Sequence, residues 1–398
     1  MTSDYTSDVL VIGAGAIGCS VAYHLAQRGA GRVLVVDRGT VGSGSSTRAT
    51  GGLREQFSTA INIRFSQLSM PFFRNAEETI GAPISYQEVG YIFLARSVEQ
   101  AEAFKRNVEL QRGLGVDAHW LTPDDVERNW PFLQLDGVVA GTWCPTDALI
   151  DQVQFMQALG QRTRELGVEI LEGVEVHSLR TDGGRVTGAE TSAGSIDAGV
   201  TVLAAGAWSP PLGATVGLDL PVTAHRREIF TASDVESLPL DMPFIADFDV
   251  GNYVRRDGDG FRISGILDPT VELERDIDMA GGQKALDWAT TLIPQIGSAT
   301  ITGGWAGLTE ITPDHHALLG EIDGLPGLIV ASGFSGHGLM HAPATGVLVS
   351  EMILDGEART LDVAELSPLR FERGQALTET MIARSHEQGD IVTRAVNR

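Results

Sequence analysis

The stretch from Val9 to Asp37, VLVIGAGAIGCSVAYHLAQRGAGRVLVVD, decides the fold of this chain. Its first residues, Val9–Ile12, form a short apolar run that predicts a strand, and Val33–Val36 predicts a second strand. Between the two strands, Ile17–Gln27 predicts a helix. The order strand, glycine turn, helix, strand is that of a βαβ unit, so we expect an α/β fold.

The turn of this unit carries a dinucleotide-binding pattern. Gly13, Gly15 and Gly18 form G-x-G-x-x-G. The first glycine allows the sharp turn, the second lets the backbone approach a pyrophosphate, and the third lets the helix pack closely on the strand. Asp37 follows Gly13 by 24 residues, about where an acid binds a ribose, and its charge would repel a 2′-phosphate. A glycine-rich turn in an ordinary βαβ unit is the alternative, but the strands, helix and acid together favour a dinucleotide.

Composition limits the possible partners and the compartment. The 398 residues carry a net charge of −23 and two cysteines, Cys19 and Cys144. The negative charge disfavours nucleic acid or an anionic membrane as a partner. Two isolated cysteines indicate neither a disulfide framework nor a metal site. Because no apolar run is long enough to span a membrane and the first residues lack a signal-peptide pattern, we expect a cytoplasmic protein.

Hydrophobic periodicity predicts the remaining elements. Further helices are expected at 62–80, 98–114, 122–133, 151–166 and 283–293. Strands are expected at 90–95, 169–171 and 200–204, with a small meander over 174–196. The alternation of apolar and polar residues in 221–265 predicts antiparallel strands with a D-G-D-G turn.

This order of elements predicts two interleaved domains. We expect a Rossmann-like cofactor-binding domain at 1–85, 145–220 and 300–365. A substrate domain built on an antiparallel sheet is expected at 86–144 and 221–299, and a C-terminal tail at 366–398, either a helix or a loose segment.

A second glycine-rich turn distinguishes between the dinucleotides. The apolar strand Leu328–Ala331 enters the segment Gly333–Met340, after which a helix runs to about Ile353. The positive end of a helix stabilises negative charge, and a reduced flavin carries such charge near N1 and its C2 carbonyl. A nicotinamide needs no such anion site. The turn therefore favours FAD and leaves an NAD-dependent enzyme as the less favoured hypothesis.

Five motifs in a fixed order carry a resemblance to a known family: GAGAIG, GGLREQF followed by NIRFS, TVLAAGAWS, WAGLTEITPD (Trp305–Asp314) and GFSGHGLMHAP (Gly333–Pro343). Over about residues 6–360 the chain resembles the D-amino acid oxidase (DAO) superfamily, particularly sarcosine oxidase β-subunits and proline or hydroxyproline dehydrogenase β-subunits. The resemblance implies an FAD-dependent enzyme that oxidises the C–N bond of an amino acid with a secondary, N-alkyl or cyclic amine. A hydride would pass to flavin N5, and the imine would then be hydrolysed.

The fingerprint and the resemblance together imply a set of cofactor contacts. They are Gly13, Gly15, Ala16, Ile17, Gly18, Asp37, Arg38, Ser45, Ser46, Gly52, Val176, Ala205, Gly206, Gly333, Ser335, Gly336, His337, Gly338 and Leu339. We expect His337 to act through its backbone rather than as a catalytic base, because hydride transfer from a neutral, well-oriented amine needs no dedicated base.

Departures from the family pattern bear on the substrate and on flavin attachment. Thr309 stands where glycine oxidase-like relatives place a carboxylate-binding arginine, and Met340 where some sarcosine-oxidising relatives place a lysine. Simple sarcosine is therefore a doubtful substrate. Ala49 and Gly307 stand where other relatives attach flavin covalently, which implies non-covalent FAD.

Two arginines complete the predicted catalytic positions, which are Arg54, Arg262, Thr309 and Met340. We expect Arg54 to bind the substrate carboxylate or to stabilise the flavin face, with a salt bridge to a neighbour such as Glu55 as the alternative. Arg262 best matches the oxygen-activating lysine of monomeric sarcosine oxidase-like enzymes, with a solvent-facing position as the alternative. Both interpretations of Arg262 predict that oxygen is a poor acceptor.

Several functional questions stay open at the level of sequence. A free-standing amine-oxidising flavoenzyme is favoured. The alternatives are a flavin-bearing subunit of a multi-subunit amine dehydrogenase and a D-amino acid or glycine oxidase-like enzyme. Electrons would leave to oxygen, a quinone or a partner protein. A homo- or hetero-oligomer is possible, and no metal site is expected.

Overall fold

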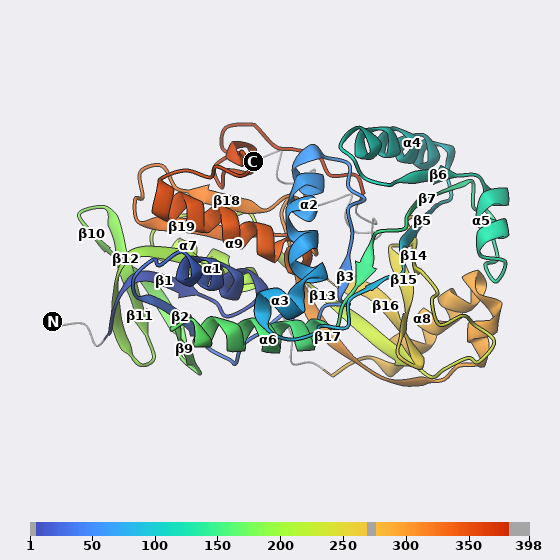
Figure 1. Ribbon diagram of the computed structural model, residues 1–398, viewed down its shortest axis with the longest axis horizontal. Helices are drawn as coiled ribbons and strands as arrows, with labels where there is room; N and C mark the ends of the chain where they lie inside the picture. The colour runs from blue at the N-terminus through green and yellow to red at the C-terminus, as the bar shows by residue number, and fades with distance from the viewer. Residues whose placement is uncertain (1–4, 269–275, 382–398) are drawn as a thin grey trace.

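The first of two large sheets has a parallel core, as the βαβ stretch predicts. The computed structural model describes residues 5–268 and 276–381 (Figure 1). Strand β1 (Tyr5–Ile12) lies between β2 (Val33–Asp37) and β12 (Gly194–Leu203), and both pairings are parallel. Strands β9 (Glu169–Glu172) and β19 (Leu328–Ser332) extend the parallel core on either side. A strand that is covered on both faces has a continuous run of apolar residues, and such runs predicted these strands from the sequence.

The edge of this sheet is antiparallel. Strands β10 (Val176–Asp182) and β11 (Arg185–Thr191) form a hairpin that continues into β12, and β18 (Leu318–Glu321) pairs with β19. The predicted meander and the predicted strand at 200–204 are thus parts of one structure, because its third strand runs on without a break into the parallel core.

Two helices cover one face of the first sheet. Helix α1 (Ala16–Gln27) follows β1, and α9 (Gly338–Asp355) packs directly against it (Figure 1). A Cβ atom at Gly346 would lie 2.6 Å from the backbone oxygen of Ser20, so this glycine permits the close approach of the helices. Helix α6 (Gln152–Glu165) also packs on α1.

The second sheet is mixed and mainly antiparallel, with the order β17-β13-β16-β15-β14-β5-β7-β6. Its strands are β5 (Tyr91–Ala95), β6 (His119–Leu121), β7 (Ala140–Cys144), β13 (Thr223–Ala232), β14 (Phe244–Asp247), β15 (Asn252–Asp257), β16 (Gly260–Asp268) and β17 (Ile301–Ile311). The predicted D-G-D-G turn joins β15 to β16. Helix α8 (Met279–Leu292) packs on one face, where Ile92, Val254 and Ile263 share a core with Ala285 and Leu286.

Shorter elements connect the two sheets. Strands β3 (Gly52–Leu53), β4 (Gln87–Glu88) and β8 (Ala148–Leu149) form a small third sheet. Helices α2 (Ala60–Arg74) and α3 (Ala76–Ile80) occupy the segment predicted as one helix, with Asn75 between them. Helices α4 (Val98–Gly113) and α5 (Pro123–Asn129) flank the second sheet, and α7 (Ser209–Ala214) follows β12 (Figure 1).

Strand β17 differs from the sequence-based expectation. Its residues fall in the range 300–365 predicted for the cofactor-binding domain, but β17 pairs with β13 of the second sheet along its whole length. Cross-strand hydrogen bonding decides this membership, and it does not show in the residue pattern of one strand alone.

The C-terminal part and the surface complete the description. Beyond the short turn η3 (Ala364–Leu366), residues 367–381 contain no helix, so the helical form of the predicted tail is wrong over these residues. No helix in residues 5–268 and 276–381 combines the length and hydropathy that a membrane span requires.

Candidate active site and cofactor site

One cavity of about 1030 Å³ runs between the two large sheets. Its walls come from the glycine turn after β1, the loop at 43–54, the ends of β12 and β19, the start of α9, and one face of the second sheet. The carboxyl ends of the parallel strands and the face of an antiparallel sheet therefore line one cavity. Ligands of open α/β sheets bind at the carboxyl ends of the strands.

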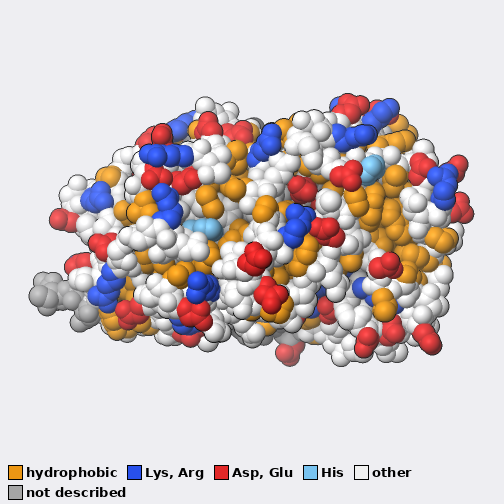
Figure 2. Space-filling model, in the orientation of Figure 1, with side chains coloured by type: hydrophobic (Ala, Val, Ile, Leu, Met, Phe, Trp, Pro, Cys, Tyr) orange, Lys and Arg blue, Asp and Glu red, His pale blue; other side chains and the backbone are white. Residues whose placement is uncertain are grey.

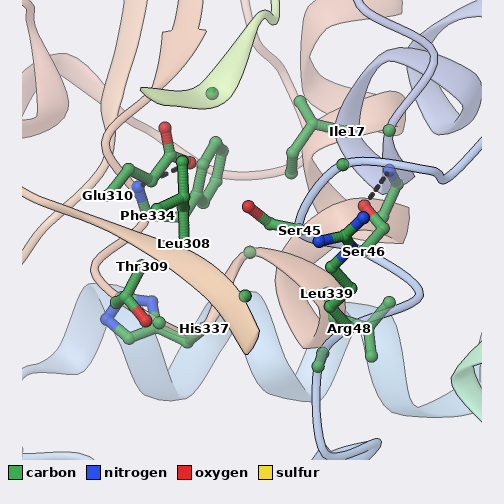
Figure 3. Close-up of a pocket in the computed structure, with 18 of the residues that line it drawn as sticks. Ile17, Ser45, Ser46, Arg48, Leu308, Thr309, Glu310, Phe334, His337 and Leu339 are labelled. Atoms are coloured by element: carbon green, nitrogen blue, oxygen red, sulfur yellow. Dashed lines mark hydrogen bonds between the residues drawn. The ribbon is translucent and has the colours of Figure 1, made fainter. Parts of the chain in front are cut away.

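The glycine turn forms the cavity end next to the first sheet. Gly13 has a φ of 110°, and a Cβ atom there would overlap the backbone oxygen of Ala204. A Cβ atom at Gly18 would overlap the backbone oxygen of Gly13, so this glycine lets helix and turn pack closely. Ala16 N–H donates to Ser46 Oγ at 2.9 Å, which ties the loop at 43–54 to the start of α1 (Figure 3).

Asp37 hydrogen-bonds to the backbone at the same end of the cavity. Its Oδ2 accepts from Ala14 N–H at 2.7 Å, and its Oδ1 accepts from Gly39 N–H at 2.7 Å. A carboxylate oxygen can accept a second hydrogen bond, so these contacts leave Asp37 able to receive a ribose hydroxyl. The next residue, Arg38, lies over the ring of Trp208 with its Cζ 3.9 Å from the centroid.

The second glycine turn places Glu310 beside the start of α9. Glu310, on β17, accepts from Phe334 N–H at 3.3 Å and from Ser332 Oγ at 3.0 Å (Figure 3). Burial raises the pKa of Glu310. Ser335, in the same turn, has a φ of 51°, and His315, which also lines the cavity, has a φ of 59°. Non-glycine residues in this region are uncommon and concentrate at functional sites.

His337 caps α9 and lines the cavity, but its ring is buried. The ring lies edge-on to Phe57 at 5.2 Å, and neither ring nitrogen has a hydrogen-bond partner within the described residues. Burial lowers the pKa of His337 well below its usual value. A neutral, weakly basic imidazole is poorly suited to take a proton, so a backbone role for His337 stays our prediction.

Arg54 reaches the cavity from the loop after β3. Its side chain is buried, its guanidinium donates to the backbone oxygen of Gln56, and its Cζ lies 3.9 Å from the centroid of Phe57. Burial lowers the pKa of Arg54. No ion pair joins Arg54 to Glu55 or to another carboxylate within residues 5–268 and 276–381. The alternative of a local salt bridge to Glu55 is therefore wrong.

The second sheet supplies an aromatic wall. Tyr91 and Phe93 alternate with core residues along β5, and Tyr91 stacks on Phe244 with centroids 4.0 Å apart. Phe244 contacts Tyr253 at 4.9 Å. Arg227, on β13, lines the cavity beside Tyr253. This face opposes the one that packs on α8, since successive side chains of a strand point to opposite faces.

A C-terminal segment closes the cavity next to this wall. We name Leu377–Met381 the C-terminal strap. Met381 is fully buried among Tyr91, Phe93 and Phe244 and lines the cavity. Glu379, also buried, accepts hydrogen bonds from residues at the start of α2, so the strap is fastened to that helix end.

Most predicted site residues meet in this cavity. Of the predicted cofactor contacts all line it except Gly18 and Gly333, which pack behind the two glycine turns. Of the predicted catalytic positions, Arg54, Thr309 and Met340 line the cavity.

Arg262 does not line the cavity. Its Nε lies 2.8 Å from Asp257 Oδ2, and its Nη1 donates to Gln152 Oε1 at 3.0 Å. The residue is only 9% exposed, so the alternative of a solvent-facing position is also wrong. The sequence placed Arg262 correctly on a strand, but its partners come from other elements.

Several cavity residues were not recognised from the sequence. Glu310 lies inside a quoted motif, and Arg227, Tyr91 and Phe93 belong to the alternating patterns of predicted strands, which gave a usable signal for a shared face. Met381 carried no such signal, because nothing in the sequence predicts where a terminal segment packs.

The cavity was tested against FAD on its own features. The turn at Gly13 lacks side chains where backbone must approach a phosphate, and α1 and α9 both direct their N-termini at the cavity. Ser45 and Ser46, on the loop that faces these helix ends, line the same part of the cavity. Ser45 and Leu308 point toward one another across the space left for it (Figure 3). These residues fit FAD.

Comparison with known proteins gives consistent matches over nearly the whole chain. The family model described as "DAO: FAD dependent oxidoreductase" matches residues 8–352. FAD-dependent oxidoreductase domain-containing protein 1 of Xenopus laevis is 30% identical, over 94% of this chain and 85% of its own.

Two solved structures share this architecture. That of L-proline dehydrogenase from P. horikoshii has a TM-score of 0.85 at 31% identity, covering 93% of this chain and 99% of its own. That of glycine oxidase from Geobacillus kaustophilus has a TM-score of 0.83 at 28% identity, covering 92% and 99%.

Proposed function

The chain belongs to the DAO family of FAD dependent oxidoreductases, and from that premise we propose that it oxidises the C–N bond of an amino acid whose nitrogen is a secondary amine. The family, the α/β fold and the FAD cofactor inferred from the motifs are confirmed. Names of similar proteins, L-proline dehydrogenase and glycine oxidase, support an amino acid as the substrate class.

Different residues of the cavity would bind different parts of FAD and the substrate. Gly13, Ser45 and Asp37 would hold the nucleotide part of FAD, and the start of α9 would face its ring system. When bound, FAD supplies the acceptor for the hydride removed from the carbon next to the nitrogen. The aromatic wall excludes water and orients the substrate against that ring.

One observation carries the proposal: Arg54 presents a buried guanidinium to an aromatic-walled cavity without a carboxylate partner in the described chain. A buried charge needs an anion, and the carboxylate of an amino acid supplies it in a bidentate contact. An amine without a carboxylate would leave the charge uncompensated.

An anaerobic test of flavin bleaching examines the proposal. The purified holoenzyme is mixed with proline, sarcosine and N-alkyl amino acids, and each is compared with its decarboxylated counterpart, such as pyrrolidine for proline. We expect bleaching by carboxylate-bearing amines and little by the counterparts. Equal bleaching by both members of a pair, or by none, would contradict the proposal.

We also propose that the cavity-lining residues of the first sheet form the cofactor domain and those of the second sheet the substrate domain. The predicted boundaries serve for this division, except that β17 contributes to the second sheet. Non-covalent attachment of FAD and slow reaction with oxygen belong to the same proposal.

A further inference from the structure

The arginines of the second sheet differ in their partners. Arg226 pairs with Glu228, Arg256 with Asp234, and Arg255 lies 3.4 Å from Asp257. Arg227 has no carboxylate partner within residues 5–268 and 276–381. Its Nη1 donates to the backbone oxygen of Gly251 at 3.1 Å, and its Cζ lies 5.9 Å from the centroid of Tyr253. Arg227 thus keeps a charge that the described protein does not neutralise.

Arg227 also lies where a ligand can reach it. It lines the cavity and retains accessible area there, while Arg226 on the same strand is buried at 1% exposure. Burial lowers the pKa of Arg227, with the Tyr253 hydroxyl as its opposing neighbour. Since a guanidinium stays protonated in proteins, the charge persists and an anion in the cavity would stabilise it.

The aromatic wall connects Arg227 with Arg54. Tyr253, beside Arg227, contacts Phe244, and Phe244 stacks on Tyr91. Phe93, the next residue on that face of β5, lies 5.4 Å from the Cζ of Arg54. Phe93 and Tyr253 both lie in register with Ala246, one on each side of β14. Arg54 and Arg227 therefore lie beside opposite sides of the aromatic wall, and neither forms an ion pair with a carboxylate within residues 5–268 and 276–381.

FAD is a poor candidate for the anion at Arg227. The phosphate-binding features, Gly13, Ser46 and the start of α1, belong to the first sheet. Arg227 lies on a strand of the second sheet, between β16 and β17. Its cross-strand neighbours are Leu267 and Gly307, and Tyr253 lies beside it, so these contacts include no phosphate-binding turn. Its anion is therefore expected to come from the substrate.

We propose that the substrate carries two anionic groups on either side of its secondary amine, as an N-(carboxyalkyl) amino acid does, with the α-carboxylate at Arg54 and the second carboxylate at Arg227. This inference rests on the proposed function and names its substrate class. Apolar carbons between the charges lie along the rings, and each carboxylate meets one guanidinium.

Binding of unreactive analogues tests the inference without any turnover. Oxydiacetate has two carboxylates around an ether oxygen, and methoxyacetate has one; a third probe, 3-(carboxymethoxy)propanoate, lengthens one arm. Binding to the holoenzyme is measured by titration calorimetry and by the shift of the flavin absorbance. We expect a dicarboxylate to bind at least about tenfold more tightly than methoxyacetate.

Variants assign this preference to one side chain. Arg227→Gln keeps a donor for Gly251 but removes the charge, so it should lose the tenfold preference while methoxyacetate affinity stays unchanged. Arg227→Lys keeps the charge and should retain part of the preference. Arg255→Gln is the matched control, since Arg255 is a buried arginine of the same sheet that does not line the cavity.

The outcomes separate the two proposals. Equal affinity of wild type for mono- and dicarboxylates, or an equal loss in Arg255→Gln and Arg227→Gln, would overturn the inference, even if proline bleaches the flavin. An Arg227-dependent preference supports it. If that preference appears but no amine bleaches the flavin, whether proline, sarcosine or an N-(carboxyalkyl) amino acid, the dianion site stands and the proposed oxidation falls.

Discussion

At the scale of single residues, the site contains ionisable side chains whose charged forms are destabilised by burial. Arg54 is 9% exposed and packs on Phe57 and Phe93 without an ion pair in the described chain. Asp147 is fully buried beside the same loop. Such groups are costly to the fold, and they concentrate where ligands or catalysis need them.

Replacing Arg54 by lysine tests its role directly. Lysine keeps the charge but cannot make a bidentate contact with a carboxylate. We expect kcat/KM for a carboxylate-bearing amine to fall at least about tenfold, about 1.4 kcal/mol of transition-state stabilisation. Steady-state kinetics with a dye acceptor measure it. Unchanged kinetics would remove Arg54 from the site.

Asp147 predicts a pH dependence of stability. Its Oδ1 accepts from Glu55 N–H at 2.7 Å and its Oδ2 from Gln56 Nε2 at 2.9 Å, so it fixes the loop that carries Arg54. Burial raises the pKa of Asp147 to about 7. Because the pKa in the unfolded chain is lower, about 3.9, the contribution is fully present below that value and is lost as the pH rises through about 7.

Thermal unfolding of wild type and Asp147→Asn at pH 5 and pH 8 checks this sign. We expect wild type to lose stability relative to the variant as the pH rises from 5 to 8, since an asparagine does not ionise. A difference between the two proteins that is the same at both pH values would contradict the assignment.

At the scale of elements, helix ends and strand faces position the chemistry. Helices α1 and α9 both begin at the cavity, and the faces of β5, β14 and β15 that turn away from α8 form its aromatic wall. The C-terminal strap adds one more wall from a distant part of the chain. Glu379 of the strap accepts hydrogen bonds from the start of α2, and Asp314 accepts one from Leu377 N–H.

Glu379→Gln tests that attachment. Glu379 accepts from Ser58 N–H at 2.8 Å, from Asn62 Nδ2 at 3.0 Å and from Met381 N–H at 2.8 Å. An amide nitrogen would face these donors with another donor, a cost of about 1–3 kcal/mol. We expect a lower melting temperature and faster cleavage of the strap by protease.

The exposed Glu365 provides a control for this change. Glu365→Gln alters the same net charge without touching the strap and should leave the cleavage rate unchanged. Equal cleavage of the strap in wild type and Glu379→Gln would show that the carboxylate does not hold it.

At the scale of the whole molecule, two sheets enclose the site while the surface stays strongly acidic. The net charge is −23, and Figure 2 shows acidic and basic side chains mixed over the visible face, with hydrophobic side chains gathered near the second-sheet end. A large cofactor bound in this cavity would lie between the two sheets, so we expect its attachment and its access to acceptors to depend on the whole fold.

Non-covalent FAD is expected from the residues around the cavity. Ala49 and Gly307 line the cavity, and neither has a nucleophilic side chain. Cys19 and Cys144 are buried and do not line the cavity. Burial raises the pKa of Cys19 to about 12 and also raises that of Cys144, so both stay unreactive thiols. Acid precipitation should give a colourless pellet and a yellow supernatant. A yellow pellet would refute this.

Slow reaction with oxygen follows from the same arrangement. The two lysines, Lys105 and Lys284, lie in α4 and α8 and do not line the cavity. Arg262 is held by Asp257 outside the cavity. Superoxide forming near the flavin would therefore lack a lysine to stabilise it.

Stopped-flow mixing of the substrate-reduced enzyme with air-saturated buffer measures this reaction. We expect reoxidation at least about tenfold slower than with an artificial acceptor, a difference of roughly 1.4 kcal/mol in barrier. Equal rates would indicate that Arg54 or Arg227 supplies the charge.

The sequence by itself determined the elements whose information is local. The βαβ unit at Val9–Asp37, the second glycine turn before α9 and the position of Arg54 after the Gly51–Gly52 pair could all be predicted, because turns, periodicity and helix starts depend on neighbouring residues. These features sufficed for the family, the cofactor and most of the cavity lining.

Only the tertiary structure decided which distant residues share a face or a partner. It placed β17 in the second sheet, tied Arg262 to Asp257 and Gln152, left Arg227 without a carboxylate in the described chain, and brought Met381 into the aromatic wall. Strand pairing depends on contacts between segments far apart in the chain. Whether an arginine forms an ion pair depends on such contacts too. No local pattern encodes those contacts, because the same strand or arginine can satisfy its hydrogen bonds with many partners.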